Sequence, residues 1–418
     1  MPTTRRNFCT TAASLLLTPP LLHGQQQPPR LYASSRPDVA AIDHDRILRA
    51  ADAYLVQMPV PLTTLLSPRS PGNINDYFSE ADDYFPNPEA NPANPTAPFL
   101  PKPGPPNPEA FTAHRDALLN LCLYVPALTA ASLLTRESAP AQSARYAAQA
   151  AAHLRAWFIT PATAMTPAIQ FAQIIRPAKT GRPEGLVEAV HLAEVAMCLP
   201  FLANTEAFTE PEHIILRQWF TTYAEWLNAS RLAGLARDTR SHHGSSWLLQ
   251  VTAIAHLQLW LPKPDDRALA ALRHQFKTVT LRAQVIADGS FPREVSTSNP
   301  YRNSLFNLDM LAAVSDLLTT RFETLWDYEL QDGPGMRVVL AHHFPYLLNR
   351  GAWPYRADYS HFVDLPLRRP ALLFAARAYT RPEYAALWQT LPPDTTIPEL
   401  QRTFPIRQPL LWITRPKP

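Results

Sequence analysis

Long apolar segments with helical spacing follow one another along most of this chain of 418 residues. One of them opens with Asn107 and Pro108, residue types typical of the first positions of a helix. Its apolar side chains, among them Leu118 and Cys122, recur every three or four positions. The alternation of apolar and polar residues that marks a half-buried strand is scarce. The sequence therefore predicts an all-α fold.

The remaining helical patterns suggest a succession of antiparallel helices joined by short loops. Such a chain can form a bundle, an α-solenoid or a closed toroid of helical hairpins. A regular solenoid is disfavoured because no fixed repeat period is present. The expected helices cover residues 141–158, 184–202, 210–232, 245–261, 268–287, 304–319, 336–348 and 370–379.

Proline is unusually common, with 45 prolines against 11 glycines, and it is densest between Pro86 and Pro108. Proline lacks the N–H that a helix needs, so this stretch must be extended or irregular. It contains Phe99 and follows the aromatic sequence DYFSEADDYF. We therefore expect it to pack on the protein rather than to form a disordered linker.

The bulk composition is that of a protein with a sizeable core and little net charge. The chain is 46% hydrophobic and 17% charged, with a formal charge of +3. A nucleic-acid-binding protein would show a concentrated basic face, so we expect no nucleic-acid partner. A mildly basic protein can still attract a polyanionic substrate through a local site.

The N-terminus resembles an export signal of the twin-arginine type. Arg5 and Arg6 precede a short apolar run at residues 12–17, and we place the cleavage site near Gly24. The run is too short to span a bilayer, and we see no later segment long and apolar enough. We predict a signal peptide at residues 1–24, a periplasmic or alternatively secreted protein, and no stable membrane insertion. A cytoplasmic protein with a basic start is the competing interpretation.

The three cysteines of the chain show no pattern typical of a catalytic or metal-binding site. Cys9 would leave with the signal, and Cys122 and Cys198 lie in apolar helical patterns, where buried free thiols are expected. A disulfide between these two remains open. No zinc-type spacing or other metal-ligand pattern is present, and nothing indicates a cofactor.

Four separated segments, together spanning roughly residues 75–370, share their order with one family. They are DYFSEADDYFPNPEANP with NPEAFTAHRDAL, MTPAIQFAQIIRPAKTGRPEGLVEAVHL, RSHHGSSW, and ADGSFPREVSTSNPYRNSLFNLDML, with AWPYRADY as a weaker fifth. The set resembles the alginate-lyase-type polysaccharide lyases, which are (α/α) toroids. The resemblance implies one large toroid domain at residues 46–395, after a flexible N-terminal part at 25–45 and before a tail at 396–418.

The same resemblance implies β-elimination on an acidic, uronate-containing polysaccharide. This chemistry needs a neutralised substrate carboxylate, a base for the C5 proton and an acid for the leaving glycosidic oxygen. In the family, an Asn, a His and an Arg hold the carboxylate, and a Tyr or the His handles protons. The motif histidine falls on His243, followed by the motif glycine at Gly244. His242 stands where the family has a second Asn, which would make that carboxylate contact sensitive to pH.

The fourth segment departs from the family. The family Arg falls on Thr297 and the family Tyr on Asn303, and neither side chain can take over the role. Tyr301 and Arg302 lie next to them and are predicted to supply a phenol and a guanidinium instead. The alternative is a packed Tyr301 and a solvated Arg302.

Five further residues are predicted to bind the sugar chain. Gln173 and Arg182 match the second segment, and Arg182 is otherwise a loop residue in a salt bridge. Tyr77, Tyr84 and Trp353 are candidates to stack on sugar rings, with packing in the core as the alternative.

Two other functions stay open at this stage. Loss of the family Arg and Tyr favours a silent protein that binds an acidic glycan without cleaving it. A hydrolase with paired carboxylates could use Asp288, Glu294 and Glu188, although no spacing rule connects them. We expect Glu294 to hold loop structure rather than to act in catalysis.

Overall fold

The computed structural model describes residues 34–90, 98–257, 259, 266–331 and 333–415. Helices dominate, as predicted. They are α1 (Val39–Tyr54), α2 (Ala113–Thr135), α3 (Pro140–Leu154), α4 (Leu192–Leu202), α5 (Glu210–Ala229), α6 (Arg231–Arg237), α7 (His242–Leu257), α8 (Arg267–Gln275), α9 (Leu281–Gln284), α10 (Pro292–Val295), α11 (Pro300–Leu318), α12 (Met336–Leu348), α13 (Pro370–Tyr379), α14 (Pro382–Thr390), α15 (Pro398–Arg402) and α16 (Pro409–Ile413).

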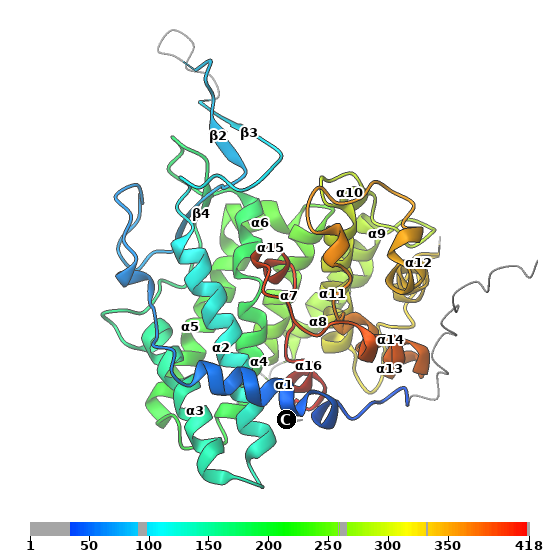
Figure 1. Ribbon diagram of the computed structural model, residues 1–418, viewed down its shortest axis with the longest axis horizontal. Coiled ribbons are helices and arrows are strands. Elements are labelled where there is room, and N and C mark those ends of the chain that lie inside the picture. Colours follow the sequence, from blue (N-terminus) through cyan, green and yellow to red (C-terminus); the bar gives the residue numbers. More distant parts are fainter. Residues whose placement is uncertain (1–33, 91–97, 258, 260–265, 332, 416–418) are drawn as a thin grey trace, which may run out of the picture. The chain divides into compact units, whose positions relative to one another are not determined.

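Within the described residues, four short strands accompany the helices. Strands β1 (Phe78–Glu80) and β4 (Phe171–Ile174) pair in parallel, and β2 (Tyr84–Pro86) pairs with β3 (Phe99–Pro101) as an antiparallel hairpin. This hairpin belongs to the proline-rich stretch, and it projects from the helices in Figure 1. The prediction of an extended segment is confirmed for the part of it that the structure describes.

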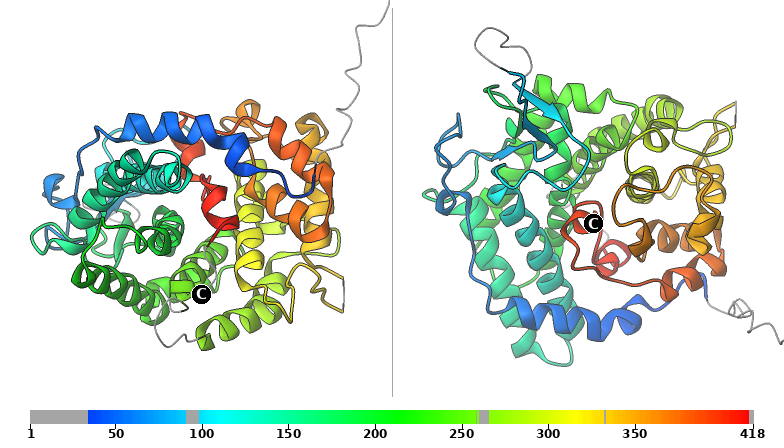
Figure 2. Two further views of the ribbon diagram at one scale, coloured as in Figure 1. Left: turned by 90° about the horizontal axis from the view of Figure 1, so that it is seen from below. Right: turned by 45° about the horizontal axis from the view of Figure 1, so that its top comes forward.

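The helices are arranged in a ring, as the toroid prediction required (Figure 2). Helix α7 packs against α4 and α11, while α2 packs against α1, α3 and α4. Nearly every residue of α7 from Gly244 onward is buried. Because α7 is buried on all sides, it is held in place by its neighbours along its whole length. Its N-terminus therefore has a fixed position, which matters for the two histidines that begin it.

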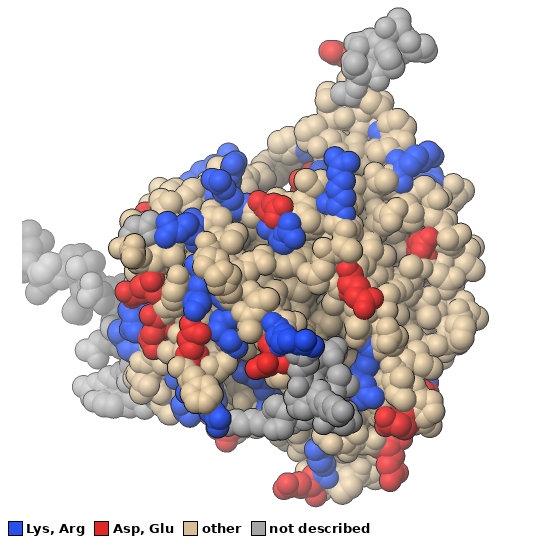
Figure 3. Space-filling model, turned by 180° about the vertical axis from the view of Figure 1, so that it is seen from behind, with Lys and Arg blue, Asp and Glu red and all other residues tan. Residues whose placement is uncertain are grey.

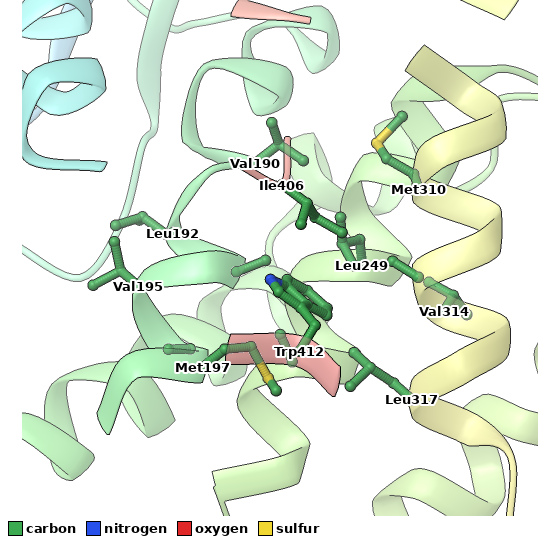
Figure 4. Packing of buried hydrophobic residues seen from close by; sticks show 14 of the residues in the cluster. Val190, Leu192, Val195, Met197, Leu249, Met310, Val314, Leu317, Ile406 and Trp412 are labelled. Carbon is green, nitrogen blue, oxygen red and sulfur yellow. The ribbon is translucent and has the colours of Figure 1, made fainter. Parts of the chain in front are cut away.

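The C-terminal segment, which we expected to be a tail, fills the middle of the ring (Figure 2). Trp412 is fully buried, and its indole N–H donates to Glu194 Oε1 at 3.2 Å. Burying one such side chain stabilises the fold by roughly 5 kcal/mol. Leu400 and residues 404–412 are likewise buried and belong to the core. Figure 4 shows Trp412 among side chains that include Val195, Met197, Leu249, Val314, Leu317 and Ile406.

Two predicted boundaries near the N-terminal side also change. Helix α1 begins at Val39, inside the part expected to be flexible, and Asp38 caps it by accepting from Ala41 N at 3.1 Å. Asn107 caps no helix. It accepts from Glu109 N and donates to Tyr84 O, so it holds a turn, and α2 starts only at Ala113. The predicted signal peptide and Cys9 lie outside the described residues.

The expectation that no later segment is apolar enough for a membrane was wrong. Helix α2 and the stretch Pro183–Leu202 are both long and apolar enough to cross one. Their apolar windows are 72% and 94% buried within the protein, however, as expected of core helices. Cys122 and Cys198 are buried free thiols, as predicted. On the face shown in Figure 3, acidic and basic side chains are interspersed.

Candidate active site

The histidine pair stands at the first turn of α7, where Glu294 holds it. The Glu294 carboxylate, fully buried, accepts from His242 N at 2.6 Å and pairs with His242 Nδ1 at 2.7 Å. Glu294 comes from α10, so the DGSFPRE segment and the histidine motif meet here. A carboxylate on Nδ1 requires the proton to be on that atom, which directs Nε2 of His242 to other partners.

His243 lies against this pair. Its ring centroid is 4.1 Å from that of His242, and its Nδ1 is 3.1 Å from Ser241 Oγ. Burial lowers the pKa of His243 well below the usual histidine value, and the positive charges of His242 and Arg182 lower it further. His243 is therefore a neutral imidazole at neutral pH. No other described residue hydrogen-bonds to Nε2 of either ring.

The surroundings of Gly244 explain why the motif has a glycine at this position. A Cβ at this position would lie 2.7 Å from Thr239 O and 3.0 Å from Arg237 O. Since both atoms belong to the backbone, neither can easily move aside. Glycine is needed here because the preceding loop folds back onto the start of α7, which places the two imidazoles.

Gln173 and Arg182, both predicted to bind sugar, form one cluster. Gln173 Oε1 accepts from Arg182 Nε at 3.0 Å and Nη2 at 2.8 Å, and Arg182 also pairs with Asp83 at 3.1 Å. Gln173 has a positive φ of 53°, an uncommon conformation that Ser79 supports by accepting from Gln173 N. The Arg182 guanidinium lies over the half-buried ring of Tyr84, 5.1 Å from its centroid. These three residues stay candidates for substrate contact.

Tyr77 and Trp353, in contrast, are core residues. The Tyr77 hydroxyl donates to Glu188 Oε2 at 2.7 Å, and the ring is fully buried. Trp353 is 7% exposed and packs edge-on against Tyr301 and Tyr346. Neither ring has a free face on which a sugar could stack, so the core alternative is correct for both.

Tyr301 also belongs to the core, and the phenol predicted from the sequence does not reach the histidines. Its side chain is buried and its hydroxyl donates to Tyr346 O at 2.9 Å. Burial raises the pKa of this phenol far above its usual value. Such a group does not exchange protons with a substrate near neutral pH.

Changing Tyr301 to phenylalanine should therefore leave turnover of a polyuronate at the wild-type level. The loss should appear in stability instead, at about 1 kcal/mol, because one buried hydrogen bond disappears. Steady-state kinetics and a denaturant titration of the variant measure both. A large fall in turnover with unchanged stability would return Tyr301 to the reaction.

Arg302 is placed differently from its neighbour. It lies one helical turn before Phe306 on α11, so both occupy the same face of that helix. The Phe306 ring is 5.6 Å from that of His242, so this face of α11 is turned toward the histidines. Arg302 is partly exposed, yet its Nε and Nη1 atoms are buried without a hydrogen-bond partner. These two donors thus have no acceptor among the described residues.

The two positions where the family pattern is lost now have a structural role. Asn303 Nδ2 donates to Thr297 Oγ1 at 3.1 Å, and Thr297 Oγ1 donates to Glu294 O at 2.7 Å. The pair thus supports the loop that carries Glu294. Arg356, which the sequence analysis did not single out, donates to the carbonyl of Thr297. Arg356 belongs to the segment AWPYRADY, whose weak match to the family was the one sequence feature that pointed to this residue.

The carboxylates considered for a hydrolase are not arranged for that reaction. Glu188 accepts from Tyr77 and Ser79, and Glu294 is fully buried against α7. Asp288 holds its own turn by accepting from Ser290 N. Among the described residues, no group of three His, Cys, Asp or Glu side chains is positioned to hold a metal ion.

The family of this chain follows from comparison with known proteins. The profile of the family described as alginate lyase matches residues 63–353, which is more than half of the chain. The chain belongs to the alginate lyase family. Family membership and fold together support a polysaccharide lyase with an acidic polysaccharide substrate. Within this alginate lyase family member, His242, His243, Gln173 and Arg182 lie inside the matched region and α15 lies beyond it.

A comparison with solved structures found similar chains. The crystal structure of an alginate lyase from Bacteroides ovatus superposes with a TM-score of 0.74 at 22% identity, covering 89% of this chain and 93% of that one. Alginate lyase A1-III from Sphingomonas species A1 superposes with a TM-score of 0.46 at 12% identity, covering 85% and 92%. A search of curated proteins found no match.

Proposed function

We propose that this protein is an exported polysaccharide lyase that cleaves an alginate-like, uronate-containing polysaccharide by β-elimination. The observation that carries the proposal is the neutral imidazole of His243 held beside basic groups. An acidic substrate is attracted by Arg182 and Arg302, while His243 remains free to accept a proton. An imidazole that titrates above working pH would lack that capacity.

The two histidines have different roles in this reaction, because their hydrogen-bond partners differ. His243 Nε2 takes the proton from C5 of the uronate, whose carboxylate is neutralised by the guanidinium of Arg302. The C4–O bond then breaks, a C4–C5 double bond forms, and the leaving oxygen receives a proton. His242 supplies that proton, because the Glu294 carboxylate at 2.7 Å compensates a positive charge on its ring. Two adjacent imidazoles resist being charged together, so one acid and one base are the favoured combination.

A panel of polyuronates tests this function. The ultraviolet absorbance of the unsaturated product is followed beside the release of reducing ends. A lyase produces both signals together on at least one substrate. New reducing ends without absorbance would establish a hydrolase and overturn the proposal.

A silent glycan-binding protein is the second candidate, favoured by the burial of Tyr301. With Asn303 in place of the family Tyr, the described part of this site contains no phenol in the expected position. The same panel separates the candidates. Retained binding of a polyuronate with neither absorbance nor reducing ends would establish the silent protein.

Export through the twin-arginine route is the third part of the proposal, and Arg5 and Arg6 support it. Changing both to lysine keeps the charge but removes the arginine pair. The variant should accumulate in the cytoplasm at full length, as measured by cell fractionation and mass of the mature chain. Export of the variant at the wild-type level would reject this route.

A further inference from the structure

The short helix α15, the last but one of the described helices, brings one more guanidinium to the candidate active site. We propose that Arg402 is a substrate-binding residue that holds, together with Arg302, the carboxylate of a bound uronate. This inference rests on the proposed acidic substrate, but it does not require that the substrate be cleaved.

The position of Arg402 follows from its neighbours on two sides. Its Nη1 is 3.5 Å from Asp82 Oδ2, in the turn between β1 and β2, and its carbonyl accepts from His191 Nε2 at 3.1 Å. Figure 2 shows the C-terminal segment between the two sides of the ring. On the other side, Glu399 of the same helix lies 3.7 Å from His361, and Asp358, three residues before His361, accepts from Arg302 N at 2.9 Å. Helix α15 therefore lies beside the start of α11, where the charge of Arg402 acts on Arg302.

Both guanidiniums have N–H groups without an acceptor. Arg402 Nε is buried and unpaired, as are Arg302 Nε and Nη1. Arg402 Nη1 pairs with Asp82 at 3.5 Å, but the carboxylates near both arginines also have closer partners. Asp82 pairs with Arg115 at 2.8 Å, and both oxygens of Asp358 accept from the backbone N–H groups of Tyr301 and Arg302.

Leaving such donors buried and unpaired costs free energy, typically about 1–3 kcal/mol for each, and more for charged groups. Burial lowers the pKa of Arg302, the charges of Asp358 and Glu399 oppose this, and Arg402 adds to the lowering. Two adjacent cations would be stabilised by an anion between them. A carboxylate offers two oxygens and can accept from both residues, which explains why the unpaired arrangement is retained.

A chain of contacts connects Arg402 to the histidines. Asp82, its partner, precedes Asp83, which pairs with Arg182 at 3.1 Å. The charge of Arg182 acts on His243, and Arg302 shares a helix face with Phe306 beside His242. Basic groups from four separate segments therefore border one place: the histidine pair, Arg182, Arg302 and Arg402.

The family comparison could not identify this residue. The matched region ends at residue 353, well before α15. Inside that region, the position of the family arginine is Thr297, which has no charge. Arg402 therefore supplies a positive charge from outside the family motif where the motif has lost one.

Calorimetric binding of a short oligouronate tests the assignment without relying on turnover. We compare the wild type with Arg402→Gln, using the free acid and its methyl ester. Gln401→Ala is the matched control, because Gln401 lies on the same helix but borders a different cavity, together with Arg46 and Tyr54. The thermal midpoint of Arg402→Gln shows whether this variant folds normally. If it folds poorly, Arg402→Lys tests whether a positive charge at this position is enough for binding.

Arg402→Gln should weaken binding of the free acid by about 10-fold or more, in the range of a lost charged hydrogen bond, while leaving binding of the ester unchanged. Arg402→Lys should recover part of the affinity and Gln401→Ala should bind normally. Equal binding of the free acid by wild type and Arg402→Gln would overturn the assignment, as would an equal loss for acid and ester. If this pattern holds but the wild type shows no turnover, the lyase is rejected and Arg402 remains a binding residue.

Discussion

Replacing His243 with alanine is expected to reduce β-elimination by about 1000-fold or more, because a positioned general base typically contributes 100- to 10,000-fold. The fold should survive, since the His243 imidazole makes one side-chain hydrogen bond, to Ser241. The thermal midpoint should therefore stay within a few degrees of the wild type. Initial rates on a polyuronate and a thermal melt measure the two effects.

His274→Ala is the control for this variant, because His274 is exposed on α8. It should keep full activity and stability. A fold that collapses in His243→Ala, or turnover that survives it, would remove His243 from the mechanism.

The pH dependence of kcat/KM follows from the same residue. The pKa of His243 is lowered, so its ring stays unprotonated at pH values where an ordinary histidine, near 6.5, is already charged. Since the base must be unprotonated, activity should persist as the pH falls through about 6.5 and decline only at lower pH. An acid limb at or above that pH would mean that another group is the base.

Replacing Arg302 with alanine is the second large expected effect. Its guanidinium is unpaired and lies on the α11 face that meets His242, where it would neutralise the substrate carboxylate. Removing such an electrostatic contribution should lower kcat/KM by about 100-fold or more. Binding should weaken too, because the carboxylate contact exists before and during the reaction.

Arg145→Ala is a matched control, since Arg145 is an exposed arginine on α3. Arg302→Lys should recover part of the activity by restoring the charge without the forked geometry. Unchanged kinetics in Arg302→Ala would show that the carboxylate is held elsewhere, and a large loss of stability would indicate a structural role.

The sequence was sufficient for the fold class, and it named the residues of one half of the candidate site. Long apolar helical patterns and the motif RSHHGSSW led to the toroid, to His243 and to the Gln173–Arg182 pair. These predictions rest on local patterns that tolerate few alternatives. Gly244, for instance, is needed wherever a loop folds back so closely onto a helix start.

The other half of the candidate site consists of Tyr301 and Arg302. The direction of these side chains depends on where α11 begins, which the sequence left uncertain. Helix α11 was expected from residue 304, but it begins at Pro300. Within the helix, Tyr301 and Arg302 are about 100° apart, so one enters the core and the other faces the histidines. In a loop, both could have pointed to the same place, and the sequence could not separate them.

Helix α15 could not be predicted from local sequence patterns, for a different reason. This helix has five residues, too few for a recognisable periodic pattern. Its position depends on long-range contacts, such as those of Arg402 with His191 and Asp82. Such contacts between distant segments leave no short-range signal.

The fate of the C5 hydrogen tests the central claim most directly. The wild-type protein is given a polyuronate that carries deuterium at C5, and the products are analysed by mass spectrometry. If His243 removes this atom in a β-elimination, every newly formed non-reducing end lacks deuterium, and turnover is slower than with the unlabelled substrate when proton removal limits the rate. New chain ends that retain deuterium at C5 would contradict the account.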